Sequence, residues 1–135
     1  MKNRIAFFGA SVTQQSDGYW RYFMNNNPQF DVKAFGYGAR HLNDAGVCYI
    51  DTVLAFHPEY CFIDWFSTGY IKYEEDTFET EMHQYIDTLI HKFISNGVKP
   101  IFLTFPDETV DKKAIYKKIA TYITNLGIPL LDIFL

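Results

Sequence analysis

The sequence is poor in cysteine. It holds two, Cys48 and Cys61, and both lie inside apolar runs without the CxxC spacing of a thiol-bound metal site. A disulfide framework needs more cysteines at closer spacings, so we expect two buried free thiols. This pattern also favours a reducing, cytoplasmic compartment and a protein without a metal ion or other cofactor.

Basic charge and long apolar stretches are also lacking. Lysine and arginine together number 12 against 16 acidic residues, which gives a net charge of −4. No basic stripe is present to neutralise a phosphate backbone, and this argues against nucleic acid as a partner. The apolar stretch at the start runs straight into Gly9-Ala10-Ser11, so we expect a first strand there rather than a signal peptide. No segment is long enough to span a membrane.

Apolar and aromatic residues are abundant. Of the 135 residues, 48% are apolar, 21% are charged and 19% are aromatic. This balance is typical of a folded protein, and the length suits a single domain over residues 1–135. The many aromatic side chains predict either a core rich in phenylalanine or a cleft or partner surface lined by rings.

Five short apolar runs alternate with amphipathic stretches. Such alternation predicts an α/β fold, in which crossover helices cover a parallel sheet. The expected strands span residues 5–8, 32–35, 60–65, 100–105 and 129–134. The expected helices span residues 18–27, 43–56, 77–95 and 110–125, and Gly97 and Gly127 are expected to end the last two.

The functional groups of an open parallel sheet collect beyond the carboxyl ends of its strands. Ser11 lies in that position after the first strand, where a helix is expected to begin. A serine there has its hydroxyl next to its own backbone N–H, so it can attack a carbonyl carbon and help to bind the resulting oxyanion. The alternative is that Ser11 only caps a helix. Neither GxGxxG nor GxxxxGK(S/T) is present, which argues against a nucleotide site.

The residues around Ser11 resemble a known family. Gly9-Ala10-Ser11-Val12-Thr13 is similar to the first motif of the SGNH (GDSL-like) hydrolases, with Ala10 in place of the usual aspartate. AFGYGARHLNDAG resembles the second motif, in which a glycine N–H contributes to the oxyanion hole. The resemblance implies that Ser11 is the nucleophile and that Gly38, or as second choice Gly36, is this glycine. Both glycines can instead be plain turn residues.

The same resemblance implies the architecture. It is a three-layer α/β/α sandwich around a parallel five-stranded sheet, flavodoxin-like, with the strand order 2-1-3-4-5. The third motif of the family, Gly-x-Asn-Asp, is replaced here by the stretch DWFSTG, which begins at Asp64. Ser67 stands where the oxyanion-binding asparagine is expected, and its hydroxyl can donate one hydrogen bond. A strand-end turn without a catalytic part is the other interpretation.

The general base of the family is not recognisable. Its Asp-x-x-His motif follows the fifth strand, where this chain reads IPLLDIFL. We expect either a piece of a longer enzyme or a short relative that has lost or relocated its base. His41 follows Gly38 by three residues, which makes it the internal histidine best placed to approach Ser11. A loop or substrate contact is the alternative role for His41.

The resemblance implies an esterase or O-acetyltransferase that works through a seryl intermediate. A small-molecule or carbohydrate ester is the expected substrate, and an acetyl group on a surface polysaccharide is the specific expectation. The alternative is a non-catalytic module of the same fold whose rings stack on sugars, formed by Trp20, Tyr37, Trp65 and Tyr70. A homodimer is a further expectation, because the last strand is expected to lie at a sheet edge and can pair with a second copy.

Overall fold

Five parallel strands form the centre of the computed structural model, which describes residues 2–65, 75–104 and 110–132. The strands are β1 (Asn3–Gly9), β2 (Phe30–Gly36), β3 (Tyr60–Ile63), β4 (Lys99–Thr104) and β5 (Leu130–Asp132). Their order is β2-β1-β3-β4-β5 and every pairing is parallel, which confirms the expected topology. The carboxyl ends of all five strands therefore lie along one edge of the sheet.

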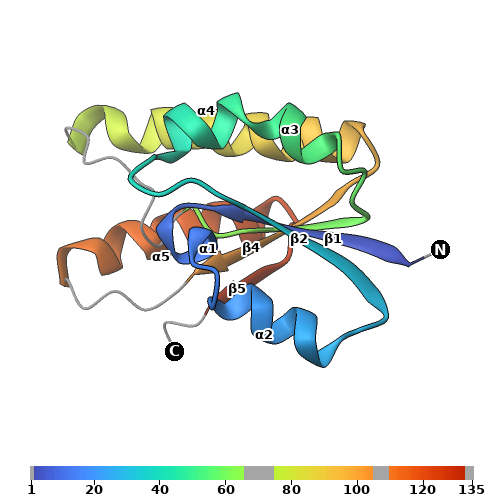
Figure 1. The fold of residues 1–135 in the computed structure, drawn as a ribbon. Coiled ribbons are helices and arrows are strands. Elements are labelled where there is room, and N and C mark those ends of the chain that lie inside the picture. The colour runs from blue at the N-terminus through green and yellow to red at the C-terminus, as the bar shows by residue number, and fades with distance from the viewer. Residues whose placement is uncertain (1, 66–74, 105–109, 133–135) are drawn as a thin grey trace.

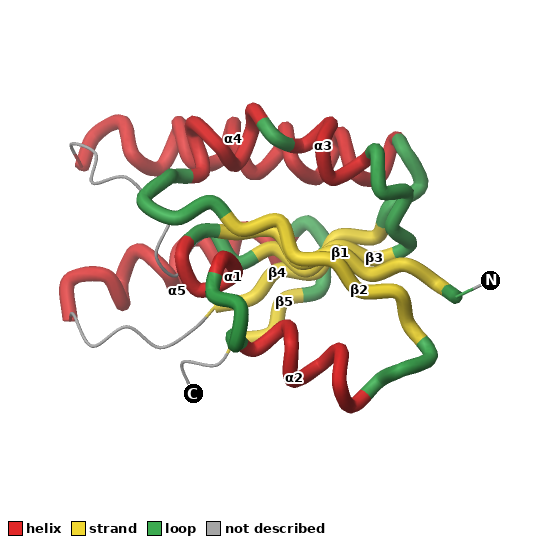
Figure 2. The backbone as a smooth tube through the Cα atoms, in the orientation of Figure 1, coloured by secondary structure: helices red, strands yellow, loops and turns green. Residues whose placement is uncertain are grey.

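Helices cover both faces of the sheet (Figures 1 and 2). Helices α3 (Ile50–Leu54), α4 (Glu75–Ser95) and α5 (Val110–Asn125) contribute to the larger core on one face, and α2 (Tyr19–Asn26) lies on the other. The single-turn helix α1 (Ser11–Gln14) joins β1 to the segment that leads into α2. The result is the expected three-layer sandwich. Within the described ranges, no helix is both long and apolar enough to cross a membrane.

Apolar side chains with no exposure fill the space between the sheet and helices α3 to α5. The largest of them are Phe8, Ile50, Ile63, Trp65, Ile86, Leu89, Phe93, Phe102 and Ile123. A second cluster under α2 is aromatic: the Phe7 ring stacks on Phe62 with centroids 5.0 Å apart and meets Phe23 of α2 edge-on at 5.5 Å. Many of the aromatic side chains therefore serve the two cores, which are continuous apolar layers on both faces of buried strands.

The two longest helices end next to glycine residues, as the sequence predicts. Gly97 and Gly127 have φ of 76° and 77° and follow α4 and α5. This conformation is open to glycine without steric penalty, and it ends a helix by redirecting the chain. Helix α5 has the expected bounds, whereas α4 begins two residues earlier than expected.

The segment between β2 and β3 differs from the expected helix over residues 43–56. A π-helical turn, η1 (Leu42–Gly46), comes first, and α3 is only five residues long. The Asp44 carboxylate accepts a hydrogen bond from the backbone N–H of His41 at 2.7 Å, and His41 is the N-cap of η1. This is the hydrogen bond that the third residue of a capping box makes to the N-cap, and it marks where the helical segment begins. Cys48 lies in this segment and is exposed, whereas Cys61 is buried. The expectation of two buried thiols is therefore wrong for Cys48.

Candidate functional site

Ser11 lies immediately beyond the carboxyl end of β1, as the first residue of α1. The buried residue Ala10 precedes it, and the Ala10 carbonyl accepts the N–H of Gln14 at 3.0 Å to close the turn. Ser11 itself is half-buried. The first strand and the short helix therefore place a serine hydroxyl at the edge of the sheet where the other strands also end.

The loop after β2 packs directly against this turn. The N–H of Tyr37 donates to the carbonyl oxygen of Gly9 at 2.9 Å. A Cβ on Gly36 would lie 2.2 Å from the backbone nitrogen of Gln14, and a Cβ on Gly38 would lie 2.0 Å from Gln14 Oε1. Gly36 is therefore needed for close approach to the backbone of Gln14, whereas Gly38 meets only the end of the Gln14 side chain, and neither glycine has a left-handed φ. These contacts bring Gly38 against the helical turn that begins at Ser11.

A buried carboxyl group, which the sequence analysis did not select for the site, lies under the same turn. Asp64 directly follows β3 and has no exposed surface. Its Oδ2 accepts a hydrogen bond from Thr13 Oγ1 at 2.7 Å, and Thr13 Oγ1 is also 3.0 Å from the hydroxyl of Tyr19. The signal in the sequence is an acidic residue at the end of an apolar run, in register with the Ser11 turn.

The environment of Asp64 shifts its protonation. Burial raises the pKa of the carboxyl to about 7, although the Thr13 hydroxyl and the N–H of Ala10 favour the ionised form and oppose this rise. Cys61 of β3 is buried as well, and its thiol pKa is raised well above the usual value by burial and then by the charge of Asp64. The region beneath the Ser11 turn therefore has few charges and is screened from water.

His41 lies in the loop after Gly38, paired with Asp44. The two atoms His41 Nδ1 and Asp44 Oδ2 are 3.6 Å apart, and both side chains are partly exposed. Partial burial raises the pKa of Asp44, but the N–H groups of His41 and Ala45 and the nearby imidazole lower it by more, so the pKa lies below its usual value. Among the described ion pairs, this one alone involves a histidine. A carboxylate on one imidazole nitrogen leaves the other to act as a base.

The aromatic residues expected at a sugar-binding cleft have different fates. Trp65 has no exposed surface: its ring lies edge-on to Phe8 at 5.3 Å and parallel to Tyr37 at 6.4 Å. This corrects the expectation that Trp65 stacks on substrate, because the ring is part of the core. Tyr37 is half-buried and stacks on Tyr49 at 4.2 Å. Ser67 and Tyr70 lie outside the described residues.

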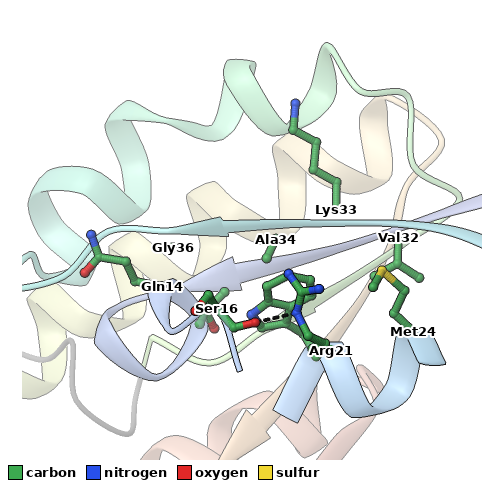
Figure 3. A pocket seen from close by; sticks show the side chains of 10 residues that line it. Gln14, Ser16, Arg21, Met24, Val32, Lys33, Ala34 and Gly36 are labelled. Atoms are coloured by element: carbon green, nitrogen blue, oxygen red, sulfur yellow. Dashed lines mark hydrogen bonds between the residues drawn. The ribbon is translucent and has the colours of Figure 1, made fainter. Parts of the chain in front are cut away.

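A groove of about 470 Å³ adjoins α1, between α2 and the edge strand β2 (Figure 3). Arg21 lies over the ring of Trp20 at 4.9 Å, and its Nε donates to the carbonyl oxygen of Ser16. The indole N–H of Trp20 donates to the carbonyl oxygen of Gln15 at 2.9 Å. The wall is formed by Thr13, Gln14, Ser16, Trp20, Arg21, Met24, Val32, Lys33, Ala34 and Gly36. The groove thus combines an aromatic ring, a guanidinium group and polar atoms of the turn that carries Ser11.

In the part of the chain that the structure describes, no three His, Cys, Asp or Glu side chains lie together so that they could hold a metal ion.

Comparisons with known proteins give a likeness in structure only. No family model and no curated protein sequence matches the chain. Among solved structures, the acetyl xylan esterase AlAXEase has a TM-score of 0.77 at 17% identity, over 97% of this chain and 77% of that chain. A putative lipolytic protein of the G-D-S-L family from Desulfitobacterium hafniense has a TM-score of 0.77 at 22% identity, with the same coverage.

A third structure extends the likeness. AlinE4, an SGNH-hydrolase family esterase, has a TM-score of 0.73 at 12% identity, over 99% of this chain and 77% of that chain. At identities this low the similarity concerns the backbone, and the residues of the site are read from this chain alone. The agreement in strand order, layers and coverage shows that the chain has the SGNH (GDSL-like) hydrolase fold.

Proposed function

We propose that this chain is a serine esterase of the SGNH type, with Ser11 as the residue that carries the acyl group. The observation that supports it most is the packing of the Gly38 loop against the turn of Ser11, through Gln14 and the hydrogen bond from Tyr37 to Gly9. An oxyanion hole needs two N–H groups that converge on one point, and this packing supports Ser11 and Gly38, which belong to adjoining segments, as the two donors.

The chemistry follows from the two donors and a base. Ser11 Oγ attacks the carbonyl carbon of an ester as its proton passes to the base, and the N–H groups of Ser11 and Gly38 bind the oxyanion that forms. The tetrahedral species then expels the alcohol, which takes up the proton and leaves an acyl group on Ser11 Oγ. Water releases the acid in a second attack, whereas a sugar hydroxyl in place of water would give an acyltransferase.

His41 is our candidate for the base. When an imidazole accepts the serine proton it becomes positively charged, and a carboxylate on the opposite ring nitrogen stabilises that charge. Asp44 is our candidate for this carboxylate, since its Oδ2 lies 3.6 Å from His41 Nδ1, a few tenths of an ångström beyond a hydrogen bond. Because its pKa lies below the usual value, the carboxyl of Asp44 is ionised at neutral pH.

The groove beside α1 supports a carbohydrate ester as substrate. Sugars are bound by aromatic rings and by groups that donate hydrogen bonds to hydroxyls, and Trp20 and Arg21 bring both to this groove. One structural neighbour is by name an acetyl xylan esterase, which agrees with an acetylated sugar. We therefore propose the acetyl ester of a carbohydrate.

Hydrolysis of p-nitrophenyl acetate tests the proposal. We expect slow turnover, complete loss of it in Ser11→Ala, and a fall of about 10²-fold in His41→Ala, which is what a positioned base typically contributes. His91→Ala is the matched control, because His91 is exposed on α4, and it should leave the rate unchanged. Turnover that survives Ser11→Ala would contradict the proposal, and sugar binding without turnover would favour a binding module instead.

A further inference from the structure

We propose that Asp64 is a positioning residue for the Ser11 turn. Its buried carboxyl group packs against Gly9, accepts a hydrogen bond from Thr13 and so keeps α1 docked on the end of β3. The stability of this docking depends on pH. The catalytic meaning of this role rests on the proposed function of Ser11. The structural part, which concerns how firmly α1 is held, can be measured without any catalysis.

The first contact is between Asp64 and Gly9. A Cβ on Gly9 would lie 1.1 Å from Asp64 Oδ1 and 2.9 Å from Thr13 Oγ1. The carboxyl group therefore fills the volume that any side chain at this last residue of β1 would take. The backbone N–H of Asp64 also donates to the carbonyl oxygen of Phe8 at 3.0 Å, so the ends of β1 and β3 are joined at this point.

The second contact holds the helix itself. Thr13 belongs to α1, two residues after Ser11, and is 1% exposed. Its hydroxyl donates to Asp64 Oδ2 at 2.7 Å, and Tyr19 of α2 is 3.5 Å from the same oxygen. Breaking this hydrogen bond would leave a buried polar atom of Asp64 unsatisfied. Asp64 thus links β3, α1 and the start of α2.

The carboxyl group is also the group under this turn that changes charge near neutrality. Two other titratable side chains of the described residues face it, Tyr19 from α2 and Cys61 from β3. Both have a pKa raised well above the usual value, mainly by burial and next by the charge of Asp64, so both are neutral when Asp64 titrates. Gly9 of β1, the N–H of Ala10 and Thr13 of α1 also face the carboxyl group, and none of these three groups titrates.

The sign of the pH effect follows from the raised pKa of Asp64, about 7 in the closed structure. When α1 lifts away from β3, water reaches the carboxyl and its pKa falls toward the usual value. The closed turn therefore binds the proton more tightly than the opened turn does. Ionisation of Asp64 between about pH 4 and pH 7 must favour opening, by the linkage of proton binding to conformation.

Amide hydrogen exchange of the whole chain tests this inference. The probes are the N–H groups of Gln14, bonded to Ala10 at 3.0 Å, and of Tyr37, bonded to Gly9 at 2.9 Å. After correction for the intrinsic exchange rate, we expect the protection of both amides to fall at least tenfold from pH 5 to pH 8. Amides in the middle of α4 should not share this dependence.

Three variants separate the contributions. Asp64→Asn keeps an acceptor for Thr13 but cannot ionise, so protection should become independent of pH. Thr13→Val removes the donor and should lower the protection of Gln14 and Tyr37 at least tenfold at pH 5. Asp51→Asn changes an exposed carboxylate on α3 and should behave as the unmodified chain does. Because Thr13→Val is a small change, it keeps the test valid if Asp64→Asn fails to fold.

The outcomes distinguish this inference from the proposed function. Protection that is unchanged in Thr13→Val and independent of pH in the unmodified chain would overturn the positioning role of Asp64. The reaction of Ser11 with a fluorophosphonate reports on the nucleophile in the same samples. If exchange behaves as expected while Ser11 stays inert, the proposed function fails and the positioning role stands; if Ser11 reacts and exchange does not respond, the reverse holds.

Discussion

The carboxyl group of Asp64 occupies the place that a side chain at Gly9 would need, with Oδ1 only 1.1 Å from the position of a Cβ. Both residues are buried at the ends of adjacent strands, so neither can move into solvent to relieve an overlap. Asp64, which is 55 residues later in the chain, therefore requires glycine at position 9.

Substitution of Gly9 by alanine should destabilise the protein strongly. Overpacking of a buried site typically costs about 1–3 kcal/mol, and we expect a loss at the upper end of this range in urea unfolding. The control is the same substitution in an Asp64→Ala background, where the space is open. There the loss should be smaller by at least about 1 kcal/mol, because residues in contact couple by this much. Equal losses in the two backgrounds would contradict the contact.

Stability should depend on pH through Asp64. Its pKa rises from 3.8 to about 7 on folding, so the unfolded chain releases this proton first and the folded state loses stability as the pH rises between these values. The loss from this group is about 4 kcal/mol at most, at about 1.4 kcal/mol for each pKa unit. Asp64→Asn should remove this part of the pH dependence of the free energy of unfolding, whereas Asp51→Asn should retain it. If the free energy of unfolding of Asp64→Asn changes with pH as it does in the unmodified chain, the carboxyl group is not buried as described.

The two glycines of the loop after β2 should respond differently to alanine. At Gly36 the new Cβ would meet the backbone of Gln14 at 2.2 Å, which cannot move without distorting α1. At Gly38 it would meet Oε1 at the free end of the Gln14 side chain, which can rotate away. We expect Gly36→Ala to lower the free energy of unfolding by about 1–3 kcal/mol and Gly38→Ala by less than about 1 kcal/mol. The opposite order would refute the docking of this loop on Gln14.

Much of the fold was predictable because its signals are local. Buried parallel strands are continuous apolar runs, and glycine marks the ends of α4 and α5. The position of Ser11 followed from the same logic, since a small-residue turn after the first strand must lie at the carboxyl edge of the sheet.

The features that sequence reasoning missed depend on contacts between distant segments. The burial of Asp64 depends on Gly9 and Thr13, neither of which is near it in sequence. Trp65 was expected to stack on a sugar, as a ring at the end of the third expected strand. Its ring instead fits into the core where Gly46 leaves room, since a Cβ on Gly46 would lie 3.3 Å from the indole. A pattern of residue types does not reveal which distant glycine accommodates a ring.

Strands β2 and β5 form the two edges of the sheet. Each edge strand has unpaired N–H and C=O groups that can pair with a second copy, and proteins protect such edges with charged side chains. β2 has exposed charges at Asp31 and Lys33, whereas β5 exposes Leu131, whose surface is 53% accessible. We therefore expect weak self-association through β5, seen as a sedimentation coefficient that rises with protein concentration.

Leu131→Lys should suppress this association, because a charge beside the edge repels its copy and must be desolvated on pairing. Leu126→Lys is the matched control: Leu126 is exposed to a similar degree, 47%, but follows α5 and lies outside β5. If both substitutions reduce association equally, the cause is general surface hydrophobicity and not pairing through the edge strand β5. A sedimentation coefficient that stays constant over a hundredfold range of concentration would refute association altogether, and the charged residues of β2 would then be only part of how this sheet protects its edges.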